Sequence, residues 1–202
     1  MGEQNVVARQ TIIAMKGHPG TGKSTIAHSI AKILKCPLID KDHFRDCTKP
    51  LQQALMLSSP NTAIHLLNKL SYDAMWHAAS TQLELGLNVV VVSPLSRLAR
   101  FRRLVELGER FGARIVIVEC KPKDLGLWRL RVEQRAKFET SSAWHKPATW
   151  EDMEKVFEGC CDYDVGDVPK IVVDTTDDQG VEALIPSVLE FVHANCDIRV
   201  NI

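Results

Sequence analysis

The pattern G-x-x-x-x-G-K-[ST] occurs without a mismatch near the start of the chain, in Gly17-His18-Pro19-Gly20-Thr21-Gly22-Lys23-Ser24-Thr25. The apolar run at 11–15 that precedes it predicts a buried strand. The segment that follows repeats apolar side chains at helical spacing, at Ile26, Ala27, Ile30, Ala31 and Leu34. A strand, a glycine-rich loop and a helix in this order form a phosphate-binding loop. The chain is therefore expected to fold as an α/β protein with this loop at the carboxyl end of a strand.

The chemistry of this segment follows from its residue types. Three glycines let the backbone turn so that its N–H groups surround an anion, namely Gly17, Gly20 and Gly22. Lys23 is placed to reach the outer phosphates, the Ser24 hydroxyl to ligate Mg²⁺, and Thr25 to contact the inner phosphate. We therefore expect residues 17–25 to bind a nucleoside triphosphate, with ATP and Mg²⁺ as the cofactors.

Composition indicates the kind of partner and the compartment. The 202 residues include 25 basic and 25 acidic ones without a dividing linker, so we expect one domain spanning 1–202. A neutral chain favours a small-molecule substrate over nucleic acid, and no apolar run has the length of a membrane span. Without a secretory signal the cysteines, including Cys160 and Cys161, are expected to be reduced, which favours the cytoplasm. Monomer and homodimer both stay open.

Apolar runs rich in β-branched residues alternate with helical patterns along the chain. The predicted strands are 11–15, 36–40, 87–93, 114–120 and 171–173, and the predicted helices are about 22–34, 61–86, 96–111, 122–137 and 180–194. This alternation predicts a five-stranded parallel sheet with helices on both faces. Two segments do not fit it, 41–60 and 138–150. We interpret both as mobile covers of the site, the second as a lid over about 136–150, with plain surface connections as the alternative.

Two carboxylates stand at the end of the second predicted strand, in Leu38-Ile39-Asp40-Lys41-Asp42-His43-Phe44-Arg45. We expect this strand beside the one that carries the glycine loop, so that its end faces the terminal phosphate and the phosphoryl acceptor. Asp40 is then placed to hold a metal-bound water, and Asp42 to orient an acceptor hydroxyl and take its proton. Arg45 is placed to bind an anionic or polar part of the acceptor. The alternative is a polar turn in which both carboxylates cap a helix.

These residues resemble a known family. Residues 17–25 followed by 39–45 are similar to the small-molecule kinase branch of the phosphate-loop (P-loop) proteins, which includes AAA_33 and zeta toxin-like proteins, shikimate kinase, chloramphenicol phosphotransferase and polynucleotide 5′-kinase. The D-x-D pair of Asp40 and Asp42 resembles shikimate kinase, and the D-x-x-R spacing of Asp42 and Arg45 resembles polynucleotide kinases. The resemblance covers nearly the whole chain and implies a P-loop NTPase fold, kinase activity, and Asp42 as the residue that meets the acceptor.

The predicted helix at 122–137 carries Arg131 and Arg135 four residues apart on one face. Related kinases carry lid arginines here that neutralise the transferring phosphoryl group, which implies catalytic roles for Arg135 near the phosphates and Arg131 nearer the nucleotide. The alternative is a solvated basic face paired with Glu133. Arg129 is the reserve candidate.

Three further positions bear on the site. His145 is a candidate to close over the acceptor, with an ordinary surface-loop histidine as the alternative. By position alone, residues 174–176 are expected to meet the adenine edge. Val92 stands where similar kinases end the third strand in an acidic residue, so Asp40 has to compensate for the missing metal-holding carboxylate.

The sequence favours an ATP-dependent kinase that transfers the γ-phosphoryl group to a hydroxyl of a small-molecule acceptor, with catalytic residues Lys23, Asp42, Arg131 and Arg135. The missing acid at Val92 keeps open a regulatory nucleotide-binding protein with weak or lost catalysis. The spacing of Asp42 and Arg45 keeps open a nucleic-acid 5′-hydroxyl kinase. A pure binder has no need of Asp42, so this residue discriminates between the classes. The identity of the acceptor and the preferred nucleotide do not follow from the sequence.

Overall fold

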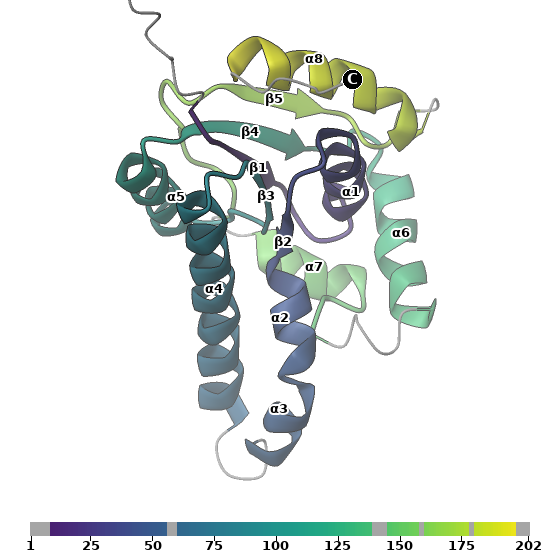
Figure 1. Cartoon of the computed structure of the whole chain (residues 1–202). Helices are drawn as coiled ribbons and strands as arrows, with labels where there is room; N and C mark the ends of the chain where they lie inside the picture. The colour runs from purple at the N-terminus through teal and green to yellow at the C-terminus, as the bar shows by residue number, and fades with distance from the viewer. Residues whose placement is uncertain (1–8, 56–59, 139–144, 158–159, 178–179, 197–202) are drawn as a thin grey trace, which may run out of the picture.

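The computed structural model describes residues 9–55, 60–138, 145–157, 160–177 and 180–196. Within them five strands form one sheet, β1 (Thr11–Lys16), β2 (Leu38–Asp40), β3 (Val89–Val92), β4 (Arg114–Cys120) and β5 (Lys170–Val173). All neighbouring strands are parallel, in the order β2-β3-β1-β4-β5 (Figure 1). The predicted five-stranded parallel α/β sheet is confirmed.

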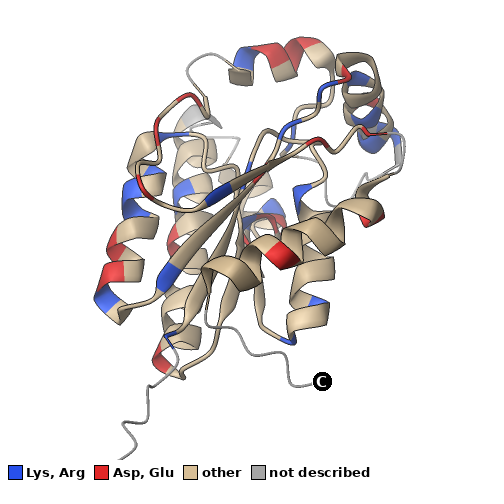
Figure 2. Cartoon of the chain, turned by 90° about the horizontal axis from the view of Figure 1, so that it is seen from above, with Lys and Arg blue, Asp and Glu red and all other residues tan. Residues whose placement is uncertain are grey.

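Helices follow or connect the strands. They are α1 (Lys23–Leu34), α2 (Lys41–Cys47), α3 (Lys49–Leu55), α4 (Pro60–Glu84), α5 (Leu98–Phe111), α6 (Leu125–Phe138), α7 (Trp150–Phe157), the 3₁₀ turn η1 (Val181–Leu184) and α8 (Ile185–Asn195). Lys and Arg side chains are interspersed with Asp and Glu over these helices (Figure 2). None of the helices in the described part of the chain combines the length and the apolar composition needed to cross a membrane.

The sheet is buried on both faces because its strands alternate between two cores. Ile12 and Ala14 of β1 belong to a core that α4 and α5 cover, whereas Ile13 and Met15 belong to a core that α1 and α8 cover (Figure 1). A parallel strand buried on both sides is expected to be apolar throughout. The sequence VVVV of β3, fully buried, has this composition. Because the strands are parallel, their carboxyl ends, and the loops that follow them, lie at one edge of the sheet.

The strand order corrects one expectation. The second strand does not lie beside the strand of the glycine loop, because β3 lies between them and pairs with both β1 and β2. The physical reason is burial: β3 is apolar throughout and takes an inner position, whereas β2 has three residues and takes the edge. In this register Asp40 lies opposite Val92. The carboxylate at the end of β2 thus stands beside the strand whose end lacks an acid.

Of the two segments that do not fit the predicted alternation, 41–60 contains helices, and the described part of 138–150 holds only the end of α6 and the start of α7. Residues 41–55 form α2 and α3, which pack against α4 rather than forming an irregular cover, and the Asp40 side chain caps α2. In the second segment, residues 139–144 lie outside the described residues, and so does most of the predicted lid. The described part runs from His145 into α7 at Trp150. Helix α7 was missed because its pattern covers only eight residues.

Candidate active site

The predicted phosphate loop lies between β1 and α1. Its three glycines have φ values of 136°, 76° and 80°, at Gly17, Gly20 and Gly22. Residues that have a side chain rarely adopt these φ values, so the loop depends on glycine for its shape. A Cβ at Gly17 would also lie 2.4 Å from the carbonyl oxygen of Cys120. Gly22 is the residue before α1, so the N-terminus of that helix faces the loop, an arrangement that favours an anion.

Lys23 folds back onto the loop. Its buried Nζ donates to the carbonyl oxygen of His18 at 2.6 Å, and Thr21 Oγ1 donates to the same oxygen at 2.9 Å. Burial lowers the pKa of the Lys23 ammonium, and the nearby carboxylates of Asp42 and Asp40 oppose that shift. A phosphate beside this ammonium would offset its lost hydration.

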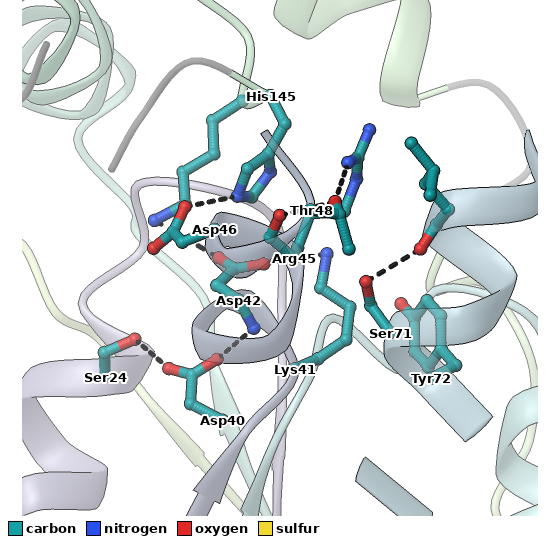
Figure 3. A network of polar contacts seen from close by, with 12 residues as sticks. Ser24, Asp40, Lys41, Asp42, Arg45, Asp46, Thr48, Ser71, Tyr72 and His145 are labelled. Carbon is teal, nitrogen blue, oxygen red and sulfur yellow. Dashed lines mark hydrogen bonds and ion pairs between the residues drawn. The ribbon is translucent and has the colours of Figure 1, made fainter. Parts of the chain in front are cut away.

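Ser24 and Asp40 form the candidate metal site. Ser24 Oγ donates to Asp40 Oδ2 at 3.1 Å, and the backbone N of Asp42 donates to Asp40 Oδ1 at 2.8 Å (Figure 3). Asp40 therefore caps α2 and also lies beside the phosphate loop, so the two interpretations of this residue are compatible. A hydroxyl and a carboxylate suit Mg²⁺, which commonly takes one or two protein oxygens and completes its shell with water and phosphate. The described residues contain no group of three His, Cys, Asp or Glu side chains that could hold a metal by themselves.

Asp42 lies between two lysines. Lys41 Nζ is 2.7 Å from Asp42 Oδ1, and Lys146 Nζ is 3.2 Å from Asp42 Oδ2. Burial raises the pKa of Asp42, but the two ammonium groups outweigh it and hold the pKa well below its usual range. A carboxylate has about four lone-pair positions, so two contacts leave room for an acceptor hydroxyl. Such an acidic carboxyl is a good hydrogen-bond acceptor and a weak base.

His145 packs over α2 rather than lying on the surface. Its side chain is 6% exposed, and Nε2 is 3.1 Å from Asp46 Oδ1 (Figure 3). Burial lowers the pKa of His145; Asp42 opposes this shift and Lys41 and Lys146 add to it, so that the pKa is about 4. The ring is therefore neutral near pH 7. This contact ties the segment that carries Lys146 to α2.

Arg45 is not among the described residues that line the cavity. Its side chain is buried, and its guanidinium donates to Thr48 Oγ1 (Figure 3) and to Gln52 Oε1 of α3. Arg45 therefore joins α2 to α3 in this structure.

The arginines of α6 occupy different environments. Arg131 Nη1 donates to the carbonyl oxygen of Thr175 at 2.7 Å, and Arg135 Nη2 donates to that of Pro147 at 3.2 Å. Both side chains line the cavity. Arg129 instead pairs with Glu133 at 2.9 Å in an exposed position, as expected for a solvated face. The structure thus brings the two predicted arginines to the site and separates the reserve candidate from it.

One cavity of about 520 Å³ brings these groups together, a size typical of small-molecule sites. Its lining comes from the phosphate loop, α1, the ends of β2 and β3, α2, α6, the segment at 145–147 and η1. The described residues of the lining are Pro19, Gly20, Gly22, Lys23, Ser24, Thr25, Asp40, Lys41, Asp42, Val92, Ser93, Pro94, Arg131, Arg135, His145, Lys146, Pro147 and Val181. Five of them are cationic and two are carboxylates.

Helices α6 and α7 are attached to the phosphate loop by an aromatic cluster. Trp128 Nε1 donates to the carbonyl oxygen of Pro19 at 3.0 Å. The centroid of the Phe157 ring lies 4.8 Å from that of His18, edge to face, and 5.1 Å from that of Trp128. Trp150 packs on Trp128 and Phe157. These contacts link the loop to the helix that carries Arg131 and Arg135. Burial lowers the pKa of His18 to about 4, with Lys23 and Lys16 adding to the effect.

The remaining predicted positions lie around the cavity. Thr175 and Thr176 are buried, and Thr175 lies beside Gly22 of the phosphate loop, but residues 174–176 are not among the described residues of the lining. Cys161 contacts the end of the third strand, where its backbone N donates to Ser96 O at 2.8 Å. Cys160 bonds through its backbone N to Phe157 O at the end of α7, which is ordinary helix-end packing.

Three polar lining residues, Lys41, Ser93 and Lys146, had not been predicted as site residues. Lys41 lies between the two predicted aspartates, and Lys146 lies in a segment noted only for His145. Ser93 follows Val92, and its buried Oγ has no hydrogen-bond partner in the described part of the structure. Their residue types alone gave no signal, because surface lysines and serines are common; only the folding of α2 and of residues 145–147 against the loop reveals them.

A glycine loop at the end of β1 in a parallel sheet of this order defines a P-loop NTPase fold, and the cavity lies beside that loop. More particularly, the chain belongs to the AAA_33 family, described as an AAA domain, whose sequence model matches residues 12–160. The resemblance to P-loop small-molecule kinases is thereby confirmed at the level of the family.

Solved structures share the fold. A presumed kinase from Chloroflexus aurantiacus is similar with a TM-score of 0.74 and 19% identity, over 94% of this chain and 100% of that one. A gluconokinase from Sinorhizobium meliloti has a TM-score of 0.57 and 17% identity, over 94% and 95% of the two chains. An APS kinase from Mycobacterium tuberculosis, in complex with AMPPNP and APS, has a TM-score of 0.56 and 16% identity, over 92% and 99%. No curated protein matches the sequence at a significant level.

Proposed function

We propose that the protein is an ATP-dependent kinase that transfers the γ-phosphoryl group to a hydroxyl of a small-molecule acceptor. The observation that carries this proposal is the position of Asp42, which lines the same cavity as Lys23 and the two α6 arginines. A protein that only binds nucleotide has no use for a carboxylate held opposite the phosphate loop. The similarity to structures named as kinases supports the same class.

In this mechanism the side chains divide the work. Lys23 and the loop N–H groups hold the β- and γ-phosphates, while Ser24 and Asp40 would hold Mg²⁺, which would reduce the charge on the phosphates. Asp42 accepts a hydrogen bond from the acceptor hydroxyl and orients its oxygen toward the γ-phosphorus. The acceptor oxygen forms a bond to that phosphorus, the bond to the β–γ bridging oxygen breaks, and ADP leaves. The hydroxyl proton passes to Asp42 and then to solvent.

Positioning contributes more than base strength in this site. The low pKa of Asp42 makes it a weak base, but phosphoryl transfer has a loose transition state in which the proton moves late. Arg131 and Arg135 are placed to neutralise the charge on the transferring group. Neutralisation by an arginine is worth about 10³-fold or more in rate in related chemistry.

Label transfer tests the proposal directly. The protein is incubated with Mg²⁺ and ATP labelled in the γ-phosphate, with and without a pooled extract of small metabolites, and with GTP as a comparison nucleotide. We expect the extract to stimulate ADP release and the label to appear in an organic product. Tight ATP binding without stimulation would overturn the kinase and favour a regulatory nucleotide-binding protein, for which Val92 at the end of β3 is the supporting observation.

A further inference from the structure

The residue predicted to bind an anionic part of the acceptor is engaged elsewhere. Arg45 is buried and bonds to Thr48 and Gln52. At the acceptor end of the cavity the cations are instead Lys41 and Lys146, which both contact Asp42 (Figure 3 shows Lys41 and Asp42). The question is what these two lysines do beyond holding one carboxylate.

The charges of the cavity separate into two sets. Lys23, Arg131 and Arg135 surround the expected place of the phosphates, and Asp40 stands with Ser24 at the metal site. Together these side chains have about two net positive charges, which match the roughly two negative charges of a triphosphate bound with Mg²⁺. The charges at the nucleotide end of the cavity would therefore be balanced when the triphosphate and Mg²⁺ are bound.

The acceptor end is not balanced. Lys41 and Lys146 bring two positive charges against the single negative charge of Asp42, and His145 beside them is neutral near pH 7. Arg45 and Asp46, outside the described lining, add one charge of each sign beside this group, and the Asp46 carboxylate attracts Lys146. Among the described residues, one positive charge is left over where the acceptor is expected.

Burial makes this excess costly. The side chains of Lys41 and Lys146 are only 9% and 20% exposed. Buried ammonium groups need a charged or hydrogen-bonding partner, and one carboxylate supplies that for two of them. The Tyr72 ring, 5.5 Å from Lys41 Nζ, favours a cation but does not neutralise it. A second anionic group in the cavity would complete the pairing.

Resting on the proposed kinase function, we propose that the acceptor carries an anionic oxygen group, a carboxylate or a phosphate, close to its reacting hydroxyl. Lys146, with Lys41 behind it, binds that group while Asp42 binds the hydroxyl. Lys146 is the more accessible of the two lysines and lies in the segment that His145 attaches to α2. It therefore determines specificity for an anionic acceptor over a neutral one.

The test separates the metabolite extract by charge. An anion exchanger divides it into a retained anionic pool and an unretained pool of neutral and cationic compounds, and each is tested for stimulation of ADP release. We expect stimulation by the retained pool. Treatment of that pool with a phosphatase distinguishes the two sources of charge, because stimulation is lost if the acceptor carries a phosphate monoester and persists if it carries a carboxylate.

Variants of one lysine then test the assignment. Lys146→Gln should raise the amount of the retained pool needed for half-maximal stimulation about 10-fold or more, since charge-assisted hydrogen bonds are worth that much, while KM for ATP changes less than about threefold. Lys146→Arg should restore part of the affinity. Lys155→Gln, at an exposed position on α7, is the matched control and should behave as the wild type.

The outcomes are distinguishable. Stimulation by the unretained pool alone would overturn the anionic acceptor and leave the kinase in place. Stimulation by the retained pool with an unchanged response of Lys146→Gln would overturn the role of the lysine. Absence of stimulation by both pools, with ATP still bound, would overturn the kinase and this inference with it.

Discussion

The two ends of the cavity are built in different ways. The phosphate end is built around one continuous segment, residues 17–25, with three glycines at positive φ, to which α6 adds Arg131 and Arg135. The acceptor end comes from side chains of separate segments, Asp42 on α2, Ser93 after β3 and Lys146 before α7. A backbone site is encoded locally, whereas a side-chain site exists only after the segments have packed.

This difference also separates the tasks of the two ends. Backbone amides and a buried lysine recognise phosphate, which every nucleoside triphosphate shares. In the proposed function, Lys41, Lys146 and Asp42 recognise the acceptor, and the neutral His145 holds the segment that carries Lys146. Substitutions in the phosphate loop should therefore weaken nucleotide binding, and those at the acceptor end should change turnover while ATP is still bound.

The largest effect is expected at Lys23. Lys23→Ala removes the only side-chain ammonium that the described part of the phosphate loop and α1 place at the γ-phosphate, so ATP affinity and turnover should both fall, turnover by about 10³-fold. Lys32→Ala, an exposed lysine on the same helix, is the control and should bind ATP normally. If the two variants lowered ATP affinity equally, the role of Lys23 in phosphate binding would be contradicted.

The second effect tests the arginines of α6. Arg135→Gln should lower turnover about 10²- to 10³-fold with little change in ATP affinity, because the charge it neutralises develops in the transition state. Arg131→Gln should weaken ATP binding more than Arg135→Gln does. Arg129→Gln removes only an exposed pair with Glu133 and should be neutral. Steady-state kinetics of the three variants would contradict the assignment if Arg129→Gln were as slow as Arg135→Gln.

The third prediction concerns the pH dependence of stability, to which His145 contributes. Its folded-state pKa of about 4 lies below the unfolded value of 6.5, so the unfolded chain binds a proton that the folded protein rejects. The free energy of unfolding should therefore fall as pH drops from 6.5 toward 4, by up to about 3 kcal/mol from this group.

Urea unfolding at pH 6.5 and pH 5 measures this change above the range in which ordinary carboxylates titrate. His145→Asn should make the pH dependence shallower, and His18, also lowered to about 4, should account for a similar share at the phosphate end. His77→Asn, at an exposed position on α4, should leave the pH dependence of stability unchanged. A wild-type stability that rises on acidification would refute the assignment.

The smallest effect is expected at Trp128. Trp128→Phe keeps an aromatic ring against Trp150 and Phe157 but removes the hydrogen bond to Pro19, which should cost about 1 kcal/mol of stability and weaken ATP binding a few-fold. Trp150→Phe preserves that hydrogen bond and is the matched control. If both variants bind ATP as the wild type does, α6 is not attached to the loop through this contact.

The parts of the fold and site that could be predicted from the sequence are those formed by neighbouring residues. The glycine loop, β1 and α1 follow from a pattern of neighbouring residues, and β4 begins and ends where its apolar run does. The place of β2 at the sheet edge depends on competition between strands for burial, which no single segment reveals. The engagement of Arg45 within α2–α3, and the approach of Lys146 to Asp42, depend on contacts between residues far apart in the chain. The sequence alone therefore did not predict the contacts of Arg45 and Lys146.

The separation of binding from turnover is tested most directly at Asp42, by measuring ATP affinity and acceptor-stimulated ADP release for the wild type and Asp42→Asn. Asp73→Asn, at an exposed position on α4, controls for the loss of a carboxylate. The account predicts that Asp42→Asn binds ATP within about threefold of the wild type while its stimulated turnover falls about 10²-fold or more. Unchanged turnover, or a loss of ATP binding equal to the loss of turnover in a variant with a normal melting temperature, would contradict it.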